Sequence, residues 1–390
     1  MNLILFDDSK RDQLLPFTFM RPCCDIRIGT LTIREKWEKR LKKKSSTYTQ
    51  DYLSAKFPLE TREENLFVNG RVCPNEKLII EIELLKQGQK LTLDGTVIAA
   101  KGNPEQLEQL IKNEDVFLDI PSSVKDFSLI NNVWHIFQKN GIEIQNDFSL
   151  LTENKTSVKL SATNRVIGNP DLIFLEEGTK AECAIFNTSD GPIYLDKHSE
   201  VMEGSVIRGP FSLGEHSQAK MATKIYGPTT FGPHCKVGGE VNNSVLFGYS
   251  NKAHDGFLGN SVISEWCNLG ADTNNSNLKN NYAPVKLHNF ISGLTENTGL
   301  QFCGLMMGDH SKAGINTMFN TGTVTGVFAN IFGGDFPPTY IPSFSWGGAK
   351  GFEKYILDKA VETAQSVMAR RGIELSATDK EIITYLSEQE

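Results

Sequence analysis

The amino-acid sequence predicts an α/β N-terminal domain, followed by a left-handed parallel β-helix of hexapeptide repeats and a helical C-terminal cap. The β-helix is predicted from an apolar residue that returns every six positions between residues 195 and 237. A period of six fits neither a helix nor a half-buried strand, and it indicates a prism of stacked triangular coils. The α/β domain is predicted from alternating strand-like and helix-like segments, and the cap from two amphipathic segments. The eight apolar positions are Leu195, Val201, Ile207, Leu213, Ala219, Ile225, Phe231 and Val237.

We expect three regions, spanning residues 1–155, 156–340 and 341–390. The first region carries four predicted strands and two predicted helices. In the last region the second helix would begin at Thr378, and both helices would cover the open edge of the final coil. The predicted strands are 2–6, 65–68, 77–82 and 92–100, and the predicted helices are 30–44, 128–141, 351–371 and 378–387.

The six-residue period is interrupted twice. After Val237 the series continues at Val245 and Phe257 with a shift of two positions, which predicts a small insertion at a corner near residues 239–244. Residues 277–304 show no repeat, so we expect a loop that projects from the prism.

Composition limits the classes of function. The chain has 390 residues, 39% of them hydrophobic and 22% charged, as is ordinary for a globular protein of two or three domains. Its net charge of −7 argues against non-specific binding to nucleic acid. Seven cysteines without a CxxC pair favour a reducing compartment, and no segment is apolar over a membrane-spanning length. We therefore expect a cytoplasmic protein with no nucleic-acid or membrane partner.

Three histidines, His198, His216 and His234, hold the same position of successive coils, 18 residues apart. One interpretation is a metal site, because imidazole is a common zinc ligand, and the protein would then be a hydrolyase. The other is a turn position, because histidine tolerates the unusual backbone of a tight corner. Trp266 and His310 hold this position in later coils, which favours a turn.

The segment from Leu14 to Pro22 resembles the start of the sugar-phosphate nucleotidyltransferases. That family carries a glycine-rich phosphate loop, then a lysine after a proline, and later an aspartate that holds magnesium. Here the loop at residues 7–11 has no glycine, Cys23 stands in place of the lysine, and Arg71 stands in place of the aspartate.

The resemblance still implies a place for nucleotide phosphates in the N-terminal domain. Its weak candidates are Lys10, Arg11 and Arg21, with a solvated basic surface as the alternative. Nucleotidyl transfer by this domain is left open, and Mg²⁺ is expected only if the domain is active.

Residues 252–260 read KAHDGFLGN, and Asn268 and Asn277 follow with a spacing of nine. These residues resemble the acetyltransferase half of the bifunctional N-acetylglucosamine-1-phosphate uridyltransferase/glucosamine-1-phosphate N-acetyltransferase (GlmU-like) family. The resemblance is strong over residues 160–335 and weak over residues 1–100. It implies a homotrimer that uses acetyl-CoA, in the biosynthesis of UDP-N-acetylglucosamine.

The resemblance assigns a role to several residues. His254 would be the general base, although counting back from Phe257 also puts it at the turn position of the histidines. Phe257 replaces a tyrosine that contacts the sugar phosphate in the family. The candidate substrate contacts are Lys252, Phe257, Asn268 and Asn277, and the weaker candidates for the cofactor are Ala313 and Gly314.

Acetyl transfer from a thioester to an amine needs a base for the amine proton and donors for the developing oxyanion. A lone imidazole suits the first task. The resemblance therefore implies N-acetylation of an amino-sugar 1-phosphate such as glucosamine-1-phosphate. The alternative is a sugar-phosphate or nucleotide-sugar binding protein, or scaffold, whose N-terminal domain has lost its chemistry.

Overall fold

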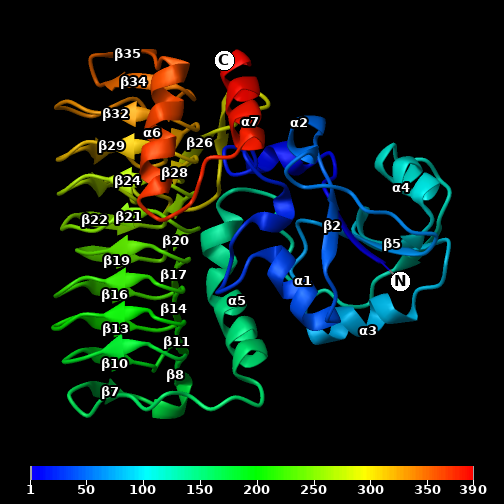
Figure 1. The fold of residues 1–390 in the computed structure, drawn as a ribbon, viewed down its shortest axis with the longest axis horizontal. Coiled ribbons are helices and arrows are strands. Elements are labelled where there is room, and N and C mark those ends of the chain that lie inside the picture. Colours follow the sequence, from blue (N-terminus) through cyan, green and yellow to red (C-terminus); the bar gives the residue numbers. More distant parts are fainter. Residues whose placement is uncertain (1, 390) are drawn as a thin grey trace.

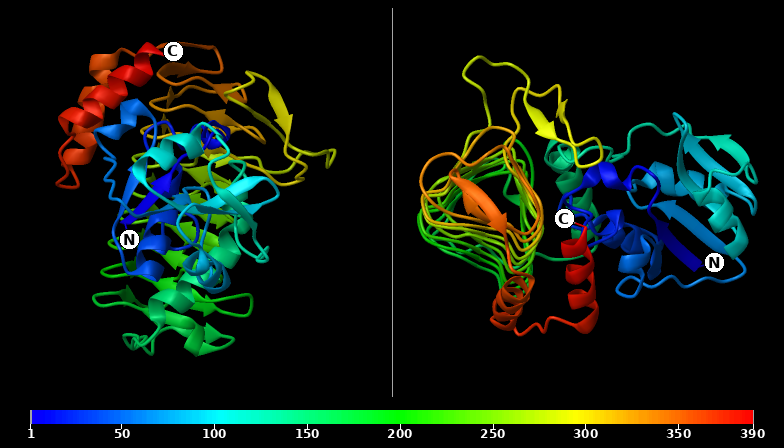
Figure 2. Two further views of the ribbon diagram at one scale, coloured as in Figure 1. Left: turned by 90° about the vertical axis from the view of Figure 1, so that its right-hand side faces the viewer. Right: turned by 90° about the horizontal axis from the view of Figure 1, so that it is seen from above.

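The computed structural model describes residues 2–389 and shows an N-terminal α/β domain lying beside a long three-sided prism (Figure 1). Seen from above, the coils of the prism superimpose as a rounded triangle with the N-terminal domain beside it (Figure 2). The predicted fold class is confirmed: an α/β domain, a parallel β-helix and C-terminal helices.

The N-terminal domain is built on a mixed six-stranded sheet in the order β2-β1-β3-β5-β4-β6. Its first helix begins at a capping box, in which Thr32 Oγ1 accepts from Glu35 N and the Glu35 carboxylate accepts from Thr32 N. The strands are β1 (Asn2–Phe6), β2 (Ser45–Tyr48), β3 (Asn65–Asn69), β4 (Gln89–Leu93), β5 (Thr96–Gly102) and β6 (Leu118–Pro121). The helices are α1 (Ile33–Leu41), α2 (Asp51–Ser54), α3 (Glu76–Leu84), α4 (Pro104–Ile111) and α5 (His135–Thr152).

The prediction of a strand over residues 77–82 is wrong, because this segment lies in helix α3. Asn75 caps the helix, and its side chain accepts a hydrogen bond from Leu78 N at 2.8 Å. Leu78 and Ile82, four residues apart, are buried, whereas Ile80 is 60% exposed. Leu78, Ile79, Ile80 and Ile82 are all aliphatic, so the sequence does not show which of them face the core with helical spacing.

The segment predicted as one strand over residues 92–100 belongs to two strands, β4 and β5. They form a hairpin across Asp94 and Gly95, which have φ angles of 47° and 77°. Two positive φ angles in succession define the tight turn that matches the twist of a hairpin.

Helix α5 begins at His135, seven residues later than predicted, and continues to Thr152. Its buried face carries Asn140, Glu143 and Asp147, all at most 2% exposed. Asp147 Oδ2 accepts from the backbone N–H groups of Thr30 and Leu31 and pairs with Lys36. Because this buried face is polar, hydrophobic periodicity could not reveal the second half of the helix.

The prism has three faces of parallel strands, and every residue of the predicted six-residue series is buried in its core. The first face contains β7 (Arg165–Ile167), β10 (Ile185–Asn187), β13 (Val206–Arg208), β16 (Lys224–Tyr226), β19 (Glu240–Asn242) and β22 (Phe257–Gly259). The second contains β8 (Ile173–Leu175), β11 (Ile193–Leu195), β14 (Phe211–Leu213), β17 (Thr229–Phe231), β20 (Val245–Leu246), β23 (Val262–Ile263), β28 (Met306–Met307), β31 (Val324–Thr325) and β33 (Tyr340–Ile341). The third contains β9 (Lys180–Ala181), β12 (Glu200–Val201), β15 (Gln218–Ala219), β18 (Lys236–Val237), β21 (Asn251–Lys252), β24 (Asn268–Leu269), β29 (Lys312–Ala313), β32 (Asn330–Ile331), β34 (Ser345–Gly348) and β35 (Gly351–Lys354).

The shift of the repeat after Val237 comes from a shortened coil, so the predicted insertion near residues 239–244 is wrong. Ala219 pairs with Val237, 18 residues on, but Val237 pairs with Lys252, only 15 residues on. The inward residue of β20 is Leu246, since it pairs with the core residue Phe231. Val245 faces outward and is apolar because the N-terminal domain covers it.

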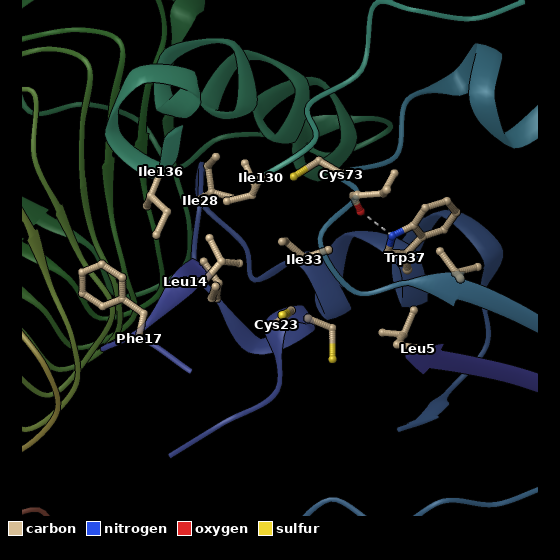
Figure 3. Packing of buried hydrophobic residues seen from close by; sticks show 14 of the residues in the cluster. Leu5, Leu14, Phe17, Cys23, Ile28, Ile33, Trp37, Cys73, Ile130 and Ile136 are labelled. Atoms are coloured by element: carbon tan, nitrogen blue, oxygen red, sulfur yellow. Dashed lines mark hydrogen bonds between the residues drawn. The ribbon is translucent and has the colours of Figure 1, made fainter. Parts of the chain in front are cut away.

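One apolar cluster joins the N-terminal domain to the second face of the prism. It includes the outward-facing residues Val245, Val262, Met306 and Val324 of the prism, all at most 1% exposed. Figure 3 shows Phe17 at the prism end of this cluster and Trp37 at the other end, where Trp37 Nε1 donates to Val72 O at 2.7 Å. The two regions are therefore packed as one body.

Arg21 crosses this interface as a buried ionic contact. Its guanidinium group donates to Ser264 Oγ at 2.7 Å, to Asp309 Oδ2 at 3.0 Å and to Glu265 Oε2 at 3.0 Å. The Arg21 side chain is 7% exposed and that of Asp309 is 1% exposed. Its carboxylate partners raise the pKa of Arg21 against the opposing effect of burial, so the group is a permanent cation.

The predicted loop over residues 277–304 is confirmed as an insertion between coils. It carries a hairpin of β26 (Lys286–His288) and β27 (Thr295–Asn297). The strands on either side of the insertion, β25 (Asn274–Asn275) and β30 (Met318–Phe319), pair with each other in a parallel two-stranded sheet. Figure 2 shows the hairpin projecting beside the triangle. It returns to the N-terminal domain, where the rings of Phe290 and Phe19 lie 5.3 Å apart.

The C-terminal helices lie along the side of the prism instead of over its open end (Figure 1). The first part of the segment predicted as helix 351–371 is strand β35, which pairs antiparallel with β34 on the last coil. Helix α6 (Leu357–Ala369) packs on the corner of the prism, and α7 (Ala377–Glu388), capped by Ser376, contacts α2. Within residues 2–389, no helix combines the length and the apolar character needed to cross a bilayer.

Arg21→Ala should lower the free energy of unfolding by about 3–5 kcal/mol, because it leaves the buried carboxylate of Asp309 without its partner. Urea unfolding followed by circular dichroism measures this. The control is Arg208→Ala, which removes an exposed pair with Asp190 and should cost less than about 1 kcal/mol. Equal effects of the two substitutions would contradict the role of Arg21.

Candidate functional site

The acidic start of the N-terminal domain is neutralised by arginines from the same chain. Arg71, which is 1% exposed, donates from Nε to Asp8 Oδ1 at 2.9 Å and also pairs with Asp8 Oδ2. Asp7 accepts from Cys23 N at 2.9 Å and from Thr49 Oγ1 at 2.6 Å, and burial raises the pKa of this carboxyl. Arg71 therefore places a cation where the resemblance expects a magnesium-binding aspartate, and these residues do not fit Mg²⁺.

Two of the three expected phosphate contacts are held inside the protein. Arg11 is 3% exposed and contacts Asp7, Thr18 O and Tyr52, and Arg21 is the interface contact described above. Only Lys10 is exposed. The structure thus corrects the expectation for Arg11 and Arg21, because neither side chain is accessible to a nucleotide.

The turn position of the coils carries a continuous stack of eight aromatic rings. Ring centroids of successive members lie 4.3 to 6.1 Å apart, and all eight residues have φ between 50° and 61°. The turn interpretation of the histidines is therefore confirmed. Among residues 2–389, no group of three His, Cys, Asp or Glu side chains is placed to hold a metal. The stack consists of His198, His216, His234, Tyr249, Trp266, His310, Phe328 and Phe344.

His254 is not part of this stack, since Tyr249 holds the turn position of its coil. It lies on the four-residue corner 253–256, which joins β21 on the third face to β22 on the first. The preceding corner has only two residues, Gly238 and Gly239, so the corner of His254 stands beside a shorter neighbour. The imidazole is exposed, and it has no hydrogen bond, ion pair or ring contact within residues 2–389.

Lys252 supports this corner from inside the prism. The side chain points into the core, is 1% exposed, and donates from Nζ to the carbonyl oxygens of His254 at 2.7 Å, Asp255 at 3.2 Å and Gly238 at 3.3 Å. Burial lowers the pKa of this amine to about 8. The expected substrate contact by Lys252 is corrected, because its charged end bonds the backbone that carries His254.

Phe257 and Asn277 come together on the first face. Phe257 is the first residue of β22, and its ring covers Gly259: a Cβ placed on that glycine would lie 2.5 Å from Phe257 Cζ and 2.6 Å from Asn277 Nδ2. Asn277 Nδ2 donates to Asn260 Oδ1 at 2.8 Å. Asn277 therefore lies beyond the Phe257 ring, roughly 10 Å along the strand direction from the corner of His254.

Asn268 lies on the third face, on the other side of the corner. It is exposed in a cavity of about 410 Å³ between this face and the end of α6. Asn251, three residues before His254, lines the same cavity. The corner of His254 thus separates two surfaces: Phe257 with Asn277 on one face, and Asn268 in a cavity on the next.

The two cofactor candidates are structural in this chain. Ala313 points into the core of the prism and is 4% exposed, so its side chain is not available to a cofactor. Gly314 lies at a corner in close contact with Gly270, where a Cβ on Gly270 would approach Gly314 C to 2.5 Å.

The sequence analysis did not find Lys236 and Lys312, which line the cavity beside Asn268 together with Arg370 and Arg371. A signal was present for the first two, because each directly precedes an inward residue, Val237 or Ala313, of the third face. The arginines end a helix that is distant in sequence, and no pattern links them to the prism.

Comparison with known proteins gives matches to parts of the chain. Residues 3–156 match the sequence model of a family described as sugar nucleotidyl transferase. Over 95 residues the chain is 34% identical to a bifunctional sugar-1-phosphate nucleotidylyltransferase/acetyltransferase of Sulfurisphaera tokodaii, covering 24% of this chain and 23% of that protein. Over 87 residues it is 34% identical to the bifunctional protein GlmU of Methanocaldococcus jannaschii, covering 22% and 21%.

The matched segments span less than a quarter of the length of these curated relatives. Among solved structures, a match to the polySia-specific acetyltransferase NeuO covers 53% of this chain and 100% of NeuO, with 11% identity and a TM-score of 0.27. The family match over residues 3–156 and the two partly matched relatives agree with the resemblance found in the sequence.

Replacing His310 should remove part of the acid sensitivity of the fold. His310 is 4% exposed within the aromatic stack, its Nδ1 has no hydrogen-bond partner within the described chain, and burial lowers its pKa well below the usual value. The unfolded state therefore binds a proton below about pH 6.5 that the native state excludes, so stability is lost as the pH falls.

His310→Phe replaces the imidazole with a phenyl ring, a side chain that the stack already contains at Phe328. Between pH 7 and pH 5 the wild type should lose about 2 kcal/mol more unfolding free energy than this variant. Urea unfolding at both pH values measures the difference. His216→Phe is the control, because the His216 side chain lies in the same stack but is 46% exposed. Parallel pH profiles for wild type and His310→Phe would contradict the expectation.

Proposed function

We propose that this protein is an acyltransferase that N-acetylates an amino-sugar 1-phosphate, such as glucosamine-1-phosphate, with acetyl-CoA as donor. The observation that carries the proposal is the place of His254. Its imidazole is exposed and unpartnered within residues 2–389, on a corner between one face with Phe257 and Asn277 and another with a polar cavity. Two ligands can approach such a corner from its two sides.

The chemistry follows from an exposed imidazole in this position. The amine of the sugar attacks the thioester carbonyl carbon, the carbon–sulfur bond breaks, and the thiolate leaves. His254 accepts the proton lost by the amine and returns it to the departing sulfur. No cysteine or serine lies beside His254 in the sequence, so direct transfer is favoured over an acyl-enzyme.

Lys252 acts on this reaction through the backbone. Its three hydrogen bonds fix the carbonyl groups of the corner, and this holds His254 in place without contact to the substrate. Phe257 has no hydroxyl, so it offers the sugar an apolar surface, and Asn277 offers an amide beyond it.

We further propose a homotrimer in which a second prism covers the first face and completes the site. Support comes from the distance between His254 and Asn277 within one chain, and from exposed apolar side chains on or next to that face. These are Val206, Tyr226 and Met318, which are 44%, 46% and 36% exposed. Closed symmetry is the usual arrangement of soluble oligomers.

The N-terminal domain, in this proposal, does not transfer nucleotides. The pairing of Asp8 with Arg71 supports this, because it occupies the carboxylate that a metal would need. The same observation favours a second candidate function, in which the whole chain binds a sugar phosphate or nucleotide sugar without turnover.

His254→Ala should reduce thiol release from acetyl-CoA with glucosamine-1-phosphate by at least about a hundredfold, the scale for loss of a general base. The matched control is His198→Ala, which removes another exposed corner histidine, at the far end of the aromatic stack. Circular dichroism establishes that both variants fold. An unchanged rate in His254→Ala would exclude it as the base, and no release by the wild type would favour the binding function.

Nucleotidyl transfer should be absent. Incubation with UTP or dTTP, N-acetylglucosamine-1-phosphate and Mg²⁺ should give no nucleotide sugar by chromatography, because Arg71 replaces the metal ligand. Removal of divalent cations with EDTA should leave thiol release unchanged. Formation of UDP- or dTDP-sugar would overturn this assignment.

A further inference from the structure

We propose that the cavity between the third face and the end of α6 is a binding site for a phosphate or pyrophosphate group. Four cationic side chains line it, namely Lys236, Lys312, Arg370 and Arg371, and no carboxylate does. The identity of the ligand rests on the proposed acyltransferase function. In that function, these residues bind the phosphorylated part of a substrate.

The cations of the cavity have no anionic partner in the protein. Among residues 2–389, none of the four forms an ion pair. Lys312 Nζ donates to the carbonyl oxygen of His310 at 2.7 Å, and Arg371 Nη2 donates to that of His234 at 3.1 Å. In a chain with 47 acidic residues and a net charge of −7, four grouped cations without a carboxylate indicate that an external anion balances them.

The prism supplies its part of the cavity as a regular ladder across four strands. Lys236 pairs with Asn251, Asn251 with Asn268, and Asn268 with Lys312. Neighbouring strands lie about 4.8 Å apart, so the two lysines stand roughly 14 Å from each other with two amides between them. Such a row offers charge at both ends and hydrogen-bond donors in the middle, which suits a pyrophosphate or a phosphate on a sugar.

The dipole of α6 accounts for only half of this charge. Arg370 and Arg371 follow the last turn of the helix, where cations are favoured by the helix dipole. Lys236 and Lys312 do not belong to this helix and lie on strands of the prism. Their presence opposite two arginines requires a different explanation.

The surroundings of the two lysines in the cavity disfavour their charged forms. Burial lowers the pKa of Lys312 to about 8, and burial together with Arg371, Lys220 and Arg370 lowers the pKa of Lys236. A bound anion would favour the charged form of both amines. Binding above pH 7 should therefore be accompanied by proton uptake.

The aromatic residues of the cavity select phosphate over a nucleobase. Tyr249 and Trp266 line it, but the aromatic stack covers both faces of each ring. Tyr249 lies between His234 and Trp266, and Trp266 lies between Tyr249 and His310. Only ring edges are available to a ligand, so a base cannot stack there. Because Asn251 lies three residues before His254, the site is roughly 10 Å along the chain from the reacting corner.

Isothermal titration calorimetry with pyrophosphate, glucosamine-1-phosphate, coenzyme A and 3′-dephospho-coenzyme A tests the site. The variants are Lys312→Met, which keeps the length of the buried stem, and Arg370→Gln, at an exposed position. We expect each to weaken binding by at least about tenfold and to reduce the proton uptake measured in buffers of different ionisation enthalpy. The control, Lys359→Met, removes an exposed cation of the same helix and should bind as the wild type does.

The ligand series identifies the source of the phosphate. Tighter binding of coenzyme A than of its 3′-dephospho form assigns the 3′-phosphate, equal binding of the two assigns the pyrophosphate, and selective binding of glucosamine-1-phosphate assigns the acceptor. Binding of none of the four by the wild type, or unaltered binding in both variants, overturns the proposal. Binding is measured without turnover, so wild-type binding without thiol release would remove the acyltransferase function and leave the anion site intact.

Discussion

The structure depends on the burial of the second face of the prism against the N-terminal domain. A β-helix normally shows an apolar residue only at inward positions, but here Val245, Val262, Met306 and Val324 point outward into the core of the other domain. Arg21 fixes the contact, since its guanidinium group pairs with Asp309 below the surface. The prism is therefore one wall of a larger body, and helices α6 and α7 close that body along its side.

The two regions differ in how many of their charged and polar side chains are available to a ligand. In the N-terminal domain the loop and the sheet edge are paired internally, with Asp8 on Arg71 and Asp7 near Arg11. On the prism, by contrast, His254 is exposed at a corner, and the cavity on the next face holds cations without carboxylates. Both features thus lie on the part of the prism that the N-terminal domain leaves uncovered.

The candidate site was accessible to sequence reasoning only in part. His254, Phe257, Asn268 and Asn277 were found because their spacing matches a motif, and the structure leaves them on the outside of the prism. Lys252 belongs to the same motif but points inward, where a shortened coil leaves three carbonyl groups to be bonded. A sequence pattern does not distinguish these cases, because side-chain direction here depends on how many residues the preceding corner contains.

The sequence by itself determined the architecture of the prism and the turn position of His198, His216 and His234, because both follow from the local period of six between residues 195 and 237. Tertiary structure alone decided which face of the prism is covered, since Val245 and Leu246 are equally apolar and only contact with the N-terminal domain separates outward from inward. It also decided that α5 continues along a buried polar face, and that Arg370 and Arg371 meet Lys236 and Lys312. These outcomes arise from contacts between segments that are distant in the sequence, and no local period encodes such contacts.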